Sequence, residues 1–274
     1  MIPILKQGVY RYWKKLENTY DDAVEDSEII KIAIASFTAT IVCFFTAMTG
    51  SGSGLILVPL LTFLGLHPVQ AIAIHKFEAT FWTCTSAIRY LRNRQVHTQD
   101  LPWYLLIGGI GAFLGARYIH LISDRTLQLI VGTIIILVAT WLLFARRKSE
   151  QRDPALWKRM LLIASMLGFG IYEGVFGAGN GYFIAALFFT LIGSNELKTV
   201  GMITVQAVVW NLVAVLTHYA FGSLLLHYAI PVAICASIGA WFGAGFAIHR
   251  GTKFVRWIII IGSYVAGVAM LVFG

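Results

Sequence analysis

Hydrophobic residues follow one another in long runs along most of this chain, and short polar stretches separate the runs. Runs such as 127–144 and 257–273 have the roughly 17–25 residues with which an α-helix crosses a bilayer. The pattern predicts helices at 29–48, 55–66, 69–91, 101–121, 125–145, 160–175, 182–192, 196–219, 225–248 and 254–273. The expected fold is therefore an all-α polytopic membrane protein.

The composition supports a membrane protein. The 274 residues are 58% hydrophobic and only 12% charged, whereas an average soluble domain is about 25% charged. A net charge of +8 would suit a nucleic-acid-binding protein. Here the basic residues gather between the hydrophobic runs, which is typical of membrane topology. We therefore expect the lipid bilayer as a partner and no nucleic acid.

Polar stretches divide the chain into four segments. Residues 1–28 combine aromatic and basic residues and predict an N-terminal interfacial segment. A basic linker at 146–155 separates a first transmembrane repeat, 29–145, from a second, 156–274. With the linker in the cytoplasm, thirteen of the 21 Lys and Arg residues lie on that side, as the positive-inside rule favours. The pattern therefore indicates a multi-pass protein of the bacterial inner membrane.

Two glycine-rich stretches interrupt the hydrophobic runs. The first glycine knot is Thr-Gly-Ser-Gly-Ser-Gly at 49–54, and the second glycine knot is Phe-Gly-Ala-Gly-Asn-Gly at 176–181. Alternating glycines disfavour a helix, because glycine loses more backbone entropy on ordering than other residues do. Inside a bilayer, non-helical backbone is tolerated where it lines a cavity or is buried in protein. Each knot is therefore a candidate ligand site.

The spacing of the motifs indicates an internal duplication. Gly50 and Gly177 are 127 residues apart, and Trp82 and Trp210 are 128 apart. The stretches Gly-Ala-Phe-Leu-Gly-Ala at 111–116 and Gly-Ala-Trp-Phe-Gly-Ala at 239–244 are also 128 apart. In each half, a helix hairpin broken at the knot returns the chain to its starting side, and three further spans follow. The second repeat should therefore be inverted relative to the first, as in many secondary transporters.

The knots predict an anion-binding site. Alternating glycines let several amides face one concavity, and the short helix after each knot directs its positive end there. The predicted substrate-binding residues of the knots are Gly50, Ser51, Gly52, Ser53, Gly54, Gly177, Gly179, Asn180 and Gly181. The alternative is that the glycines only allow close helix packing. We favour that second interpretation for Gly111, Gly115, Gly239 and Gly243.

Ionisable residues inside the predicted spans are further candidates. Lys76 is costly in a bilayer unless it has a partner, so it either attracts the substrate or forms a structural pair. Glu78, His75 and Glu173 could couple transport to protons, and Glu78 could instead be the counter-ion of Lys76 or His75. Gln206 stands where the first repeat has Glu78, and we include it in the substrate site.

These motifs resemble the TauE/SafE sulfite exporter family, also called the 4-toluene sulfonate uptake permease family. The resemblance rests on the paired knots, the helix at 71–90 and the two Gly-Ala-x-x-Gly-Ala stretches, and covers roughly 30–272. It implies a secondary transporter that exports a small sulfur oxyanion, sulfite or a related ion, by alternating access. The second knot departs from the first, with Asn180 in place of Ser53 and Ala186 in place of Pro59.

Other functions fit the pattern less well. An anion channel and an exporter of an organosulfonate or thiosulfate are the alternatives that we retain. An enzyme would need a nucleophile beside a base or a metal cluster, and the sequence has neither spacing; the three cysteines lie singly in hydrophobic runs. We therefore expect a transporter and not an enzyme, with no metal site and no cofactor. The expected ligand is a small inorganic or organosulfonate anion, and a homodimer is left open.

Overall fold

The computed structural model describes residues 27–96, 99–118 and 155–273, together with the isolated residues 133, 136, 137 and 140. All regular secondary structure in these residues is helical, as the hydrophobic runs predicted. The N-terminal interfacial segment, the run at 125–145 and the basic linker lie almost wholly outside the described residues.

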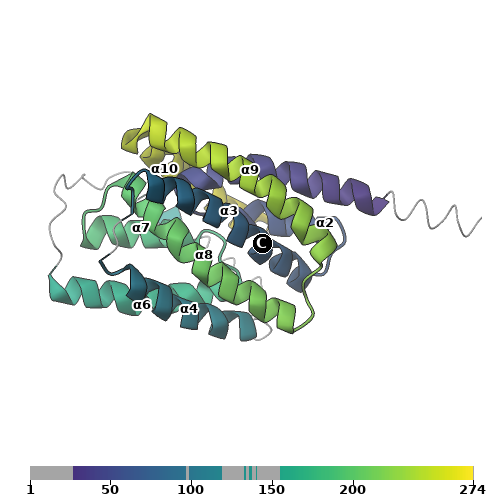
Figure 1. Cartoon of the computed structure of the whole chain (residues 1–274), viewed down its shortest axis with the longest axis horizontal. Helices are drawn as coiled ribbons and strands as arrows, with labels where there is room; N and C mark the ends of the chain where they lie inside the picture. The colour runs from purple at the N-terminus through teal and green to yellow at the C-terminus, as the bar shows by residue number, and fades with distance from the viewer. Residues whose placement is uncertain are drawn as a thin grey trace, which may run out of the picture.

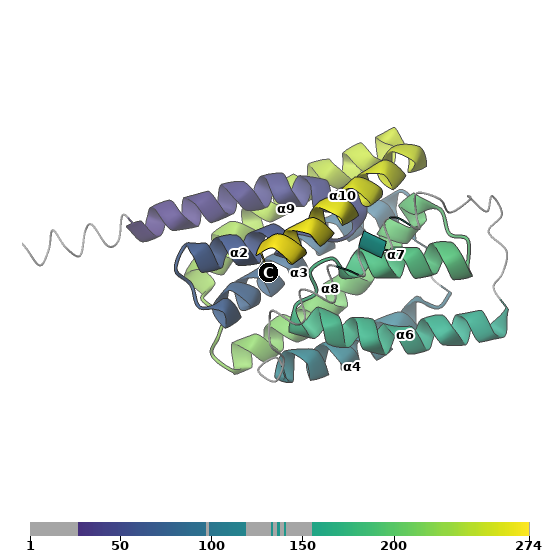
Figure 2. The same cartoon turned by 180° about the vertical axis from the view of Figure 1, so that it is seen from behind.

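The observed helices begin and end within a few residues of the predicted runs, except that α4 ends at Arg117. A first helix, which carries no label in Figure 1, spans Ser27–Thr49. The others are α2 (Gly54–Phe63), α3 (Pro68–Arg92), α4 (Leu101–Arg117), α6 (Leu156–Val175), α7 (Asn180–Leu191), α8 (Glu196–Ala220), α9 (Leu226–Arg250) and α10 (Thr252–Phe273) (Figures 1 and 2).

The helices α3 and α8 begin at matching places in the two repeats because a polar side chain caps each of them. The His67 side chain accepts a hydrogen bond from the backbone N–H of Val69. Asn195, 128 residues later, accepts one from the backbone N–H of Lys198 at 2.8 Å. Such caps satisfy amides that the first helical turn leaves without partners. The two caps agree with the duplication predicted from the motifs.

The helices α3 and α8 pack against each other in the middle of the molecule (Figure 1). On one side α9 packs on α3, and the helix Ser27–Thr49 lies along α9. On the other side α4 packs on α8 and α6 packs on α4 (Figure 2). The short helices α2 and α7 follow the two knots directly.

Glycines allow the helices of the two repeats to approach closely. Gly111 and Gly115 of α4 lie against the backbone of α6. Gly239 and Gly243 of α9 lie in the same way against the backbone of the helix Ser27–Thr49. The packing interpretation of these four glycines is therefore confirmed. In both places a fourth span of one repeat contacts the first span of the other.

We predict that Gly111→Ala destabilises the protein by about 1–3 kcal/mol, the usual cost of overpacking. An added Cβ at Gly111 would overlap the backbone carbonyl of Leu167 and lie 2.8 Å from the amide nitrogen of Ile171. Gly109→Ala, on the same helix, is the matched control, because its Cβ would meet nothing closer than a Val209 methyl at 4.0 Å. Thermal unfolding in detergent measures both, and equal midpoints would contradict the packing role.

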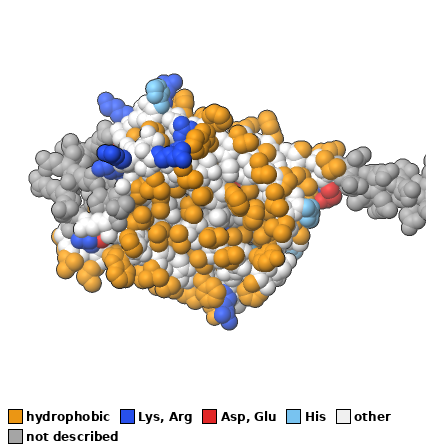
Figure 3. All heavy atoms as spheres, in the orientation of Figure 1, with side chains coloured by type: hydrophobic (Ala, Val, Ile, Leu, Met, Phe, Trp, Pro, Cys, Tyr) orange, Lys and Arg blue, Asp and Glu red, His pale blue; other side chains and the backbone are white. Residues whose placement is uncertain are grey.

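The outer surface is suited to lipid. Hydrophobic side chains cover most of the face in Figure 3, and the few Lys and Arg side chains lie near its margins. Phe37 and Phe63, for example, are 69% and 88% exposed. By length and composition, three of the described helices could each cross a membrane: Ser27–Thr49, Glu196–Ala220 and Leu226–Arg250. Burying such a surface in hydrocarbon is favourable, whereas in water it would promote association.

Candidate functional site

Each knot interrupts a helical hairpin, and glycine is what permits its backbone. In the first knot Gly50 and Gly52 have φ values of +79° and +116°. In the second knot Gly177 and Gly179 have φ values of +73° and +80°. These values lie in the left-handed region that residues with a Cβ rarely adopt. The left-handed glycines stand at matching positions of the repeats, so both knots end the preceding helix in the same way.

The two knots contact each other. The backbone N–H of Gly181 donates a hydrogen bond to the hydroxyl oxygen of Ser51 at 3.0 Å. The approach is close, because a Cβ added at Gly181 would lie 2.6 Å from the Ser51 Cβ and 2.9 Å from the Gly50 carbonyl oxygen. Two segments that are far apart in the sequence therefore meet inside the helix bundle.

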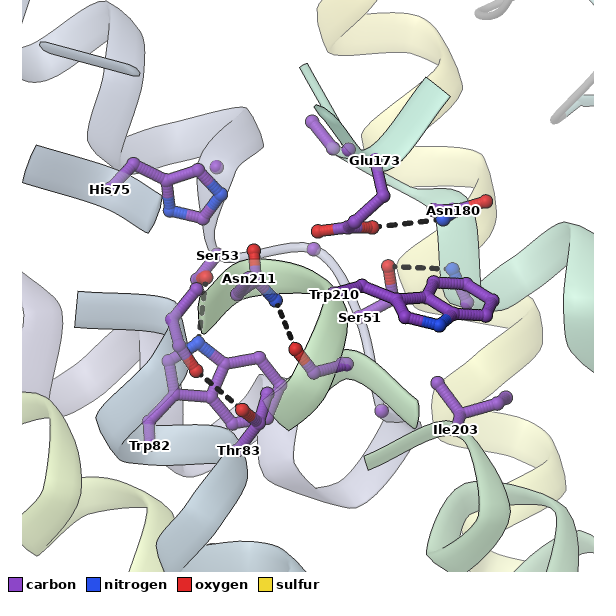
Figure 4. Close-up of a pocket in the computed structure, with 18 of the residues that line it drawn as sticks. Ser51, Ser53, His75, Trp82, Thr83, Glu173, Asn180, Ile203, Trp210 and Asn211 are labelled. Carbon is purple, nitrogen blue, oxygen red and sulfur yellow. Dashed lines mark hydrogen bonds between the residues drawn. The ribbon is translucent and has the colours of Figure 1, made fainter. Parts of the chain in front are cut away.

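A small cavity of about 30 Å³ lies where the knots meet (Figure 4). All five predicted residues of the first knot and four residues of the second line it, and α3 and α8 supply most of the remaining wall. The lining residues are Gly50, Ser51, Gly52, Ser53, Gly54, Gly177, Ala178, Asn180, Gly181, His75, Ala79, Trp82, Thr83, Glu173, Ile184, Ile203, Ala207, Trp210 and Asn211.

The first knot has hydrogen-bond donors to spare. Within the described part of the chain, the amides of Gly52, Ser53 and Gly54 have no hydrogen-bond acceptor. The Ser51 hydroxyl accepts from Gly181, and the Ser53 hydroxyl accepts from the Trp82 indole N–H at 3.1 Å. Each hydroxyl hydrogen is then left to donate elsewhere. Buried donors of this kind are costly unless a ligand or water accepts from them.

Lys76 forms a buried ion pair with Glu173 across the two repeats. The ammonium lies 2.9 Å from one carboxylate oxygen, and the side-chain amide of Asn180 donates to the other oxygen at 2.8 Å. Lys76 is fully buried and does not line the cavity, whereas Glu173 does. Of the two interpretations of Lys76, the structure contains the pair with a carboxylate. The partner is Glu173 and not Glu78.

Glu78 is instead the partner of His75, one turn away on the same helix. The His75 Nδ1 lies 3.0 Å from one carboxylate oxygen, and the Cys43 thiol donates to the other at 2.7 Å. Glu78 is fully buried, while His75 lines the cavity. The second of the two partners considered for Glu78 is therefore the one that the structure shows.

Two predicted site residues lie outside the cavity wall. Gln206 is fully buried, and neither its side-chain nitrogen nor its side-chain oxygen has a partner among the described residues. By the repeat spacing, Ile203 and Gly170 stand where the first repeat has His75 and Cys43. The partners of Glu78 therefore have no polar equivalents around Gln206. Gly179 shapes the second knot but does not line the cavity.

Sequence reasoning missed Thr83 and Asn211, which line the cavity from α3 and α8. They follow the matched tryptophans Trp82 and Trp210, which line the same cavity. The signal was available, because two polar residues occupy the same place in both repeats beside a conspicuous pair. It was weak, because a Thr or Asn on a hydrophobic helix is often satisfied by its own backbone.

The comparison with known families decides the identity. The family model described as "Sulfite exporter TauE/SafE" matches residues 35–270. The chain belongs to this family. The resemblance seen in the knots is thereby confirmed. The TauE/SafE proteins are membrane transporters and not enzymes, so this is a multi-pass bacterial membrane protein of a transporter family.

Curated relatives cover most of the TauE/SafE chain. A "Probable membrane transporter protein" of Haemophilus influenzae is 27% identical over 90% of this chain and 96% of its own length. "Probable membrane transporter protein ORF9" of a Sinorhizobium species is 25% identical over 86% and 90%. "Probable membrane transporter protein YfcA" of Escherichia coli K12 is 24% identical over 88% and 89%. No solved structure matches this chain.

Proposed function

We propose that this TauE/SafE protein is a secondary transporter that exports a small sulfur oxyanion, sulfite or a related ion. The cavity between the two glycine knots is the proposed binding site. The observation that carries the proposal is that both knots, from separate repeats, line one cavity. Its volume of about 30 Å³ favours a small inorganic anion over a larger organosulfonate.

The donors of the first knot match the needs of an oxyanion. An anion that enters the bilayer interior loses its hydration and needs several N–H and O–H groups in return. The spare amides of Gly52, Ser53 and Gly54 lie at the start of α2, where the helix dipole also favours negative charge. The hydroxyls of Ser51 and Ser53 add two further donors.

The charged groups near the cavity support weak binding, which a transporter needs for release. Lys76 and Glu173 neutralise each other, so no unpaired charge in the described wall of the cavity traps an anion. Binding then depends mainly on neutral donors, whose net contribution per hydrogen bond is about 0.5–1.5 kcal/mol. Such a site holds an anion for a time and can still release it.

We further propose alternating access through two inverted repeats. The 127- to 128-residue spacing relates the knots, the capping residues and the glycine contacts between repeats. Rocking of one repeat against the other around the shared cavity would expose the anion to each side in turn. Export of an anion is favoured by an inside-negative potential, by about 2.3 kcal/mol per charge per 100 mV.

Sulfite flux into liposomes that hold the purified protein tests the function. We expect saturable uptake that is faster than into empty liposomes and that thiosulfate or an organosulfonate competes with weakly. Flux that rises with concentration without saturating would favour an anion channel. Rates equal to those of empty liposomes would contradict the transporter proposal, and faster transport of thiosulfate or an organosulfonate would change the substrate.

Proton coupling through His75 and Glu78 can be tested in the same liposomes. If Glu78 carries a proton with each anion, Glu78→Gln should shift the net charge moved per sulfite by one unit, while downhill flux continues. The Gln side chain keeps the shape and removes the titrating group. The reversal potential under fixed ion gradients measures this charge. An identical charge per sulfite in the wild type and the variant would rule out a proton on Glu78.

A further inference from the structure

A buried acceptor lies in the cavity wall formed by α8. Asn211 is 2% exposed, and its side-chain NH₂ group donates to the Ala207 carbonyl at 2.9 Å. Its side-chain oxygen has no donor among the described residues. Figure 4 shows this oxygen directed into the space between His75 and Glu173. A buried carbonyl oxygen without a donor is unfavourable, so the site is built to receive a hydrogen from a ligand.

The equivalent position of the first repeat offers a second acceptor. Thr83, 128 residues before Asn211, is buried and lines the same cavity from α3. Its hydroxyl donates to the Ala79 carbonyl at 2.6 Å, so its hydrogen is occupied and the oxygen lone pairs are left. Both repeats thus present an acceptor oxygen one residue after the matched tryptophan.

Donors and acceptors therefore come from different elements around the cavity. The first knot supplies spare amides and hydroxyl hydrogens, whereas α3 and α8 supply Thr83 and Asn211 as acceptors. The oxygens of Glu173 are already taken by Lys76 and Asn180. A fully deprotonated oxyanion only accepts hydrogen bonds, so it would satisfy the knot and leave the Asn211 oxygen facing a negative charge.

Resting on the proposed function, we infer that the cavity selects an oxyanion that carries a hydrogen. The bound species is a monoanion with bare oxygens toward the knots and one O–H group toward Asn211, of which hydrogen sulfite is the example. Asn211 is then a specificity-determining residue, with Thr83 as its counterpart in the first repeat. Sulfate and sulfonates of the same size lack the O–H group and fit only the donor side.

Methanesulfonate is the sharpest probe of this inference, because it has the charge and the SO₃ group of hydrogen sulfite with a methyl group instead of a hydroxyl. We expect the wild-type protein to bind hydrogen sulfite at least about tenfold more tightly, at a mildly acidic pH where sulfite is mainly the monoanion. Equilibrium binding to the detergent-solubilised protein measures both affinities, with sulfate as a third ligand.

Asn211→Leu should remove most of that preference by weakening hydrogen sulfite binding. Thr199→Val is the matched control, since Thr199 is a fully buried residue of the same helix that does not line the cavity. Equal affinities of the wild type for hydrogen sulfite and methanesulfonate would overturn the inference, and this comparison needs no variant. An unchanged preference in folded Asn211→Leu would overturn the role of Asn211. Binding of neither anion would instead overturn the proposed function.

Discussion

Gly181→Val is expected to reduce sulfite binding and flux by about a hundredfold, the loss expected when roughly two hydrogen bonds to a charged group are broken. The Gly181 amide bonds to the Ser51 hydroxyl, and an added Cβ would lie 2.6 Å from the Ser51 Cβ. The larger valine side chain would push the knots apart and open the contact that forms the cavity. Binding to the detergent-solubilised variant and flux in liposomes measure the effect.

Gly168→Ala is the control for this substitution. Gly168 lies on α6, the helix that leads to the second knot, and an added Cβ there would meet no atom within 4 Å. Its binding and flux should equal those of the wild type. If folded Gly181→Val binds sulfite with wild-type affinity, the contact between the knots is not needed for the site, and the proposed location is wrong.

Lys76→Met is expected to destabilise the protein by about 3–5 kcal/mol, because it leaves the buried Glu173 carboxylate without its counter-charge. Adding Glu173→Gln should recover most of this loss, since a neutral amide needs no counter-charge. Denaturant or thermal unfolding in detergent measures both variants. Lys31→Met is the control, because Lys31 and Glu28 form a part-exposed pair on the surface and its loss should cost less than about 1 kcal/mol.

The double variant also separates the two interpretations of Lys76. If Lys76 only neutralises Glu173, the refolded double variant should transport sulfite nearly as fast as the wild type. A stable double variant without flux would instead show that the positive charge attracts the anion. If Lys76→Met costs no more stability than Lys31→Met, the buried pair does not hold the two repeats together.

Local features of the chain predicted most of the helices and both breaks. A run of about 20 hydrophobic residues has few stable structures other than a helix in a bilayer, so its place in the sequence decides its structure. The knots are local in the same sense: the positive φ values of Gly50 and Gly177 need glycine wherever the segment lies. The packing role of Gly111 and Gly239 could also be predicted, because small residues at that spacing commonly form helix contacts.

Partners of polar side chains could not be predicted in this way. His75 and Glu78 are one turn apart on one helix, so their pairing was among the alternatives that the sequence offered. Lys76 and Glu173 are in different repeats, and only the packed bundle brings them together. Gln206 was expected in the site because of its place in the repeat, but the structure buries it outside the cavity wall.

The sequence by itself determined the helices, the two glycine breaks and the repeat that relates them, because bilayer thickness and backbone conformation act on each segment separately. Only the tertiary structure decided that the knots share one cavity, that Lys76 pairs with Glu173 and that Thr83 and Asn211 face the knots. These contacts depend on which faces of distant helices meet. That choice is made by close packing over the whole bundle and is not encoded at any single position.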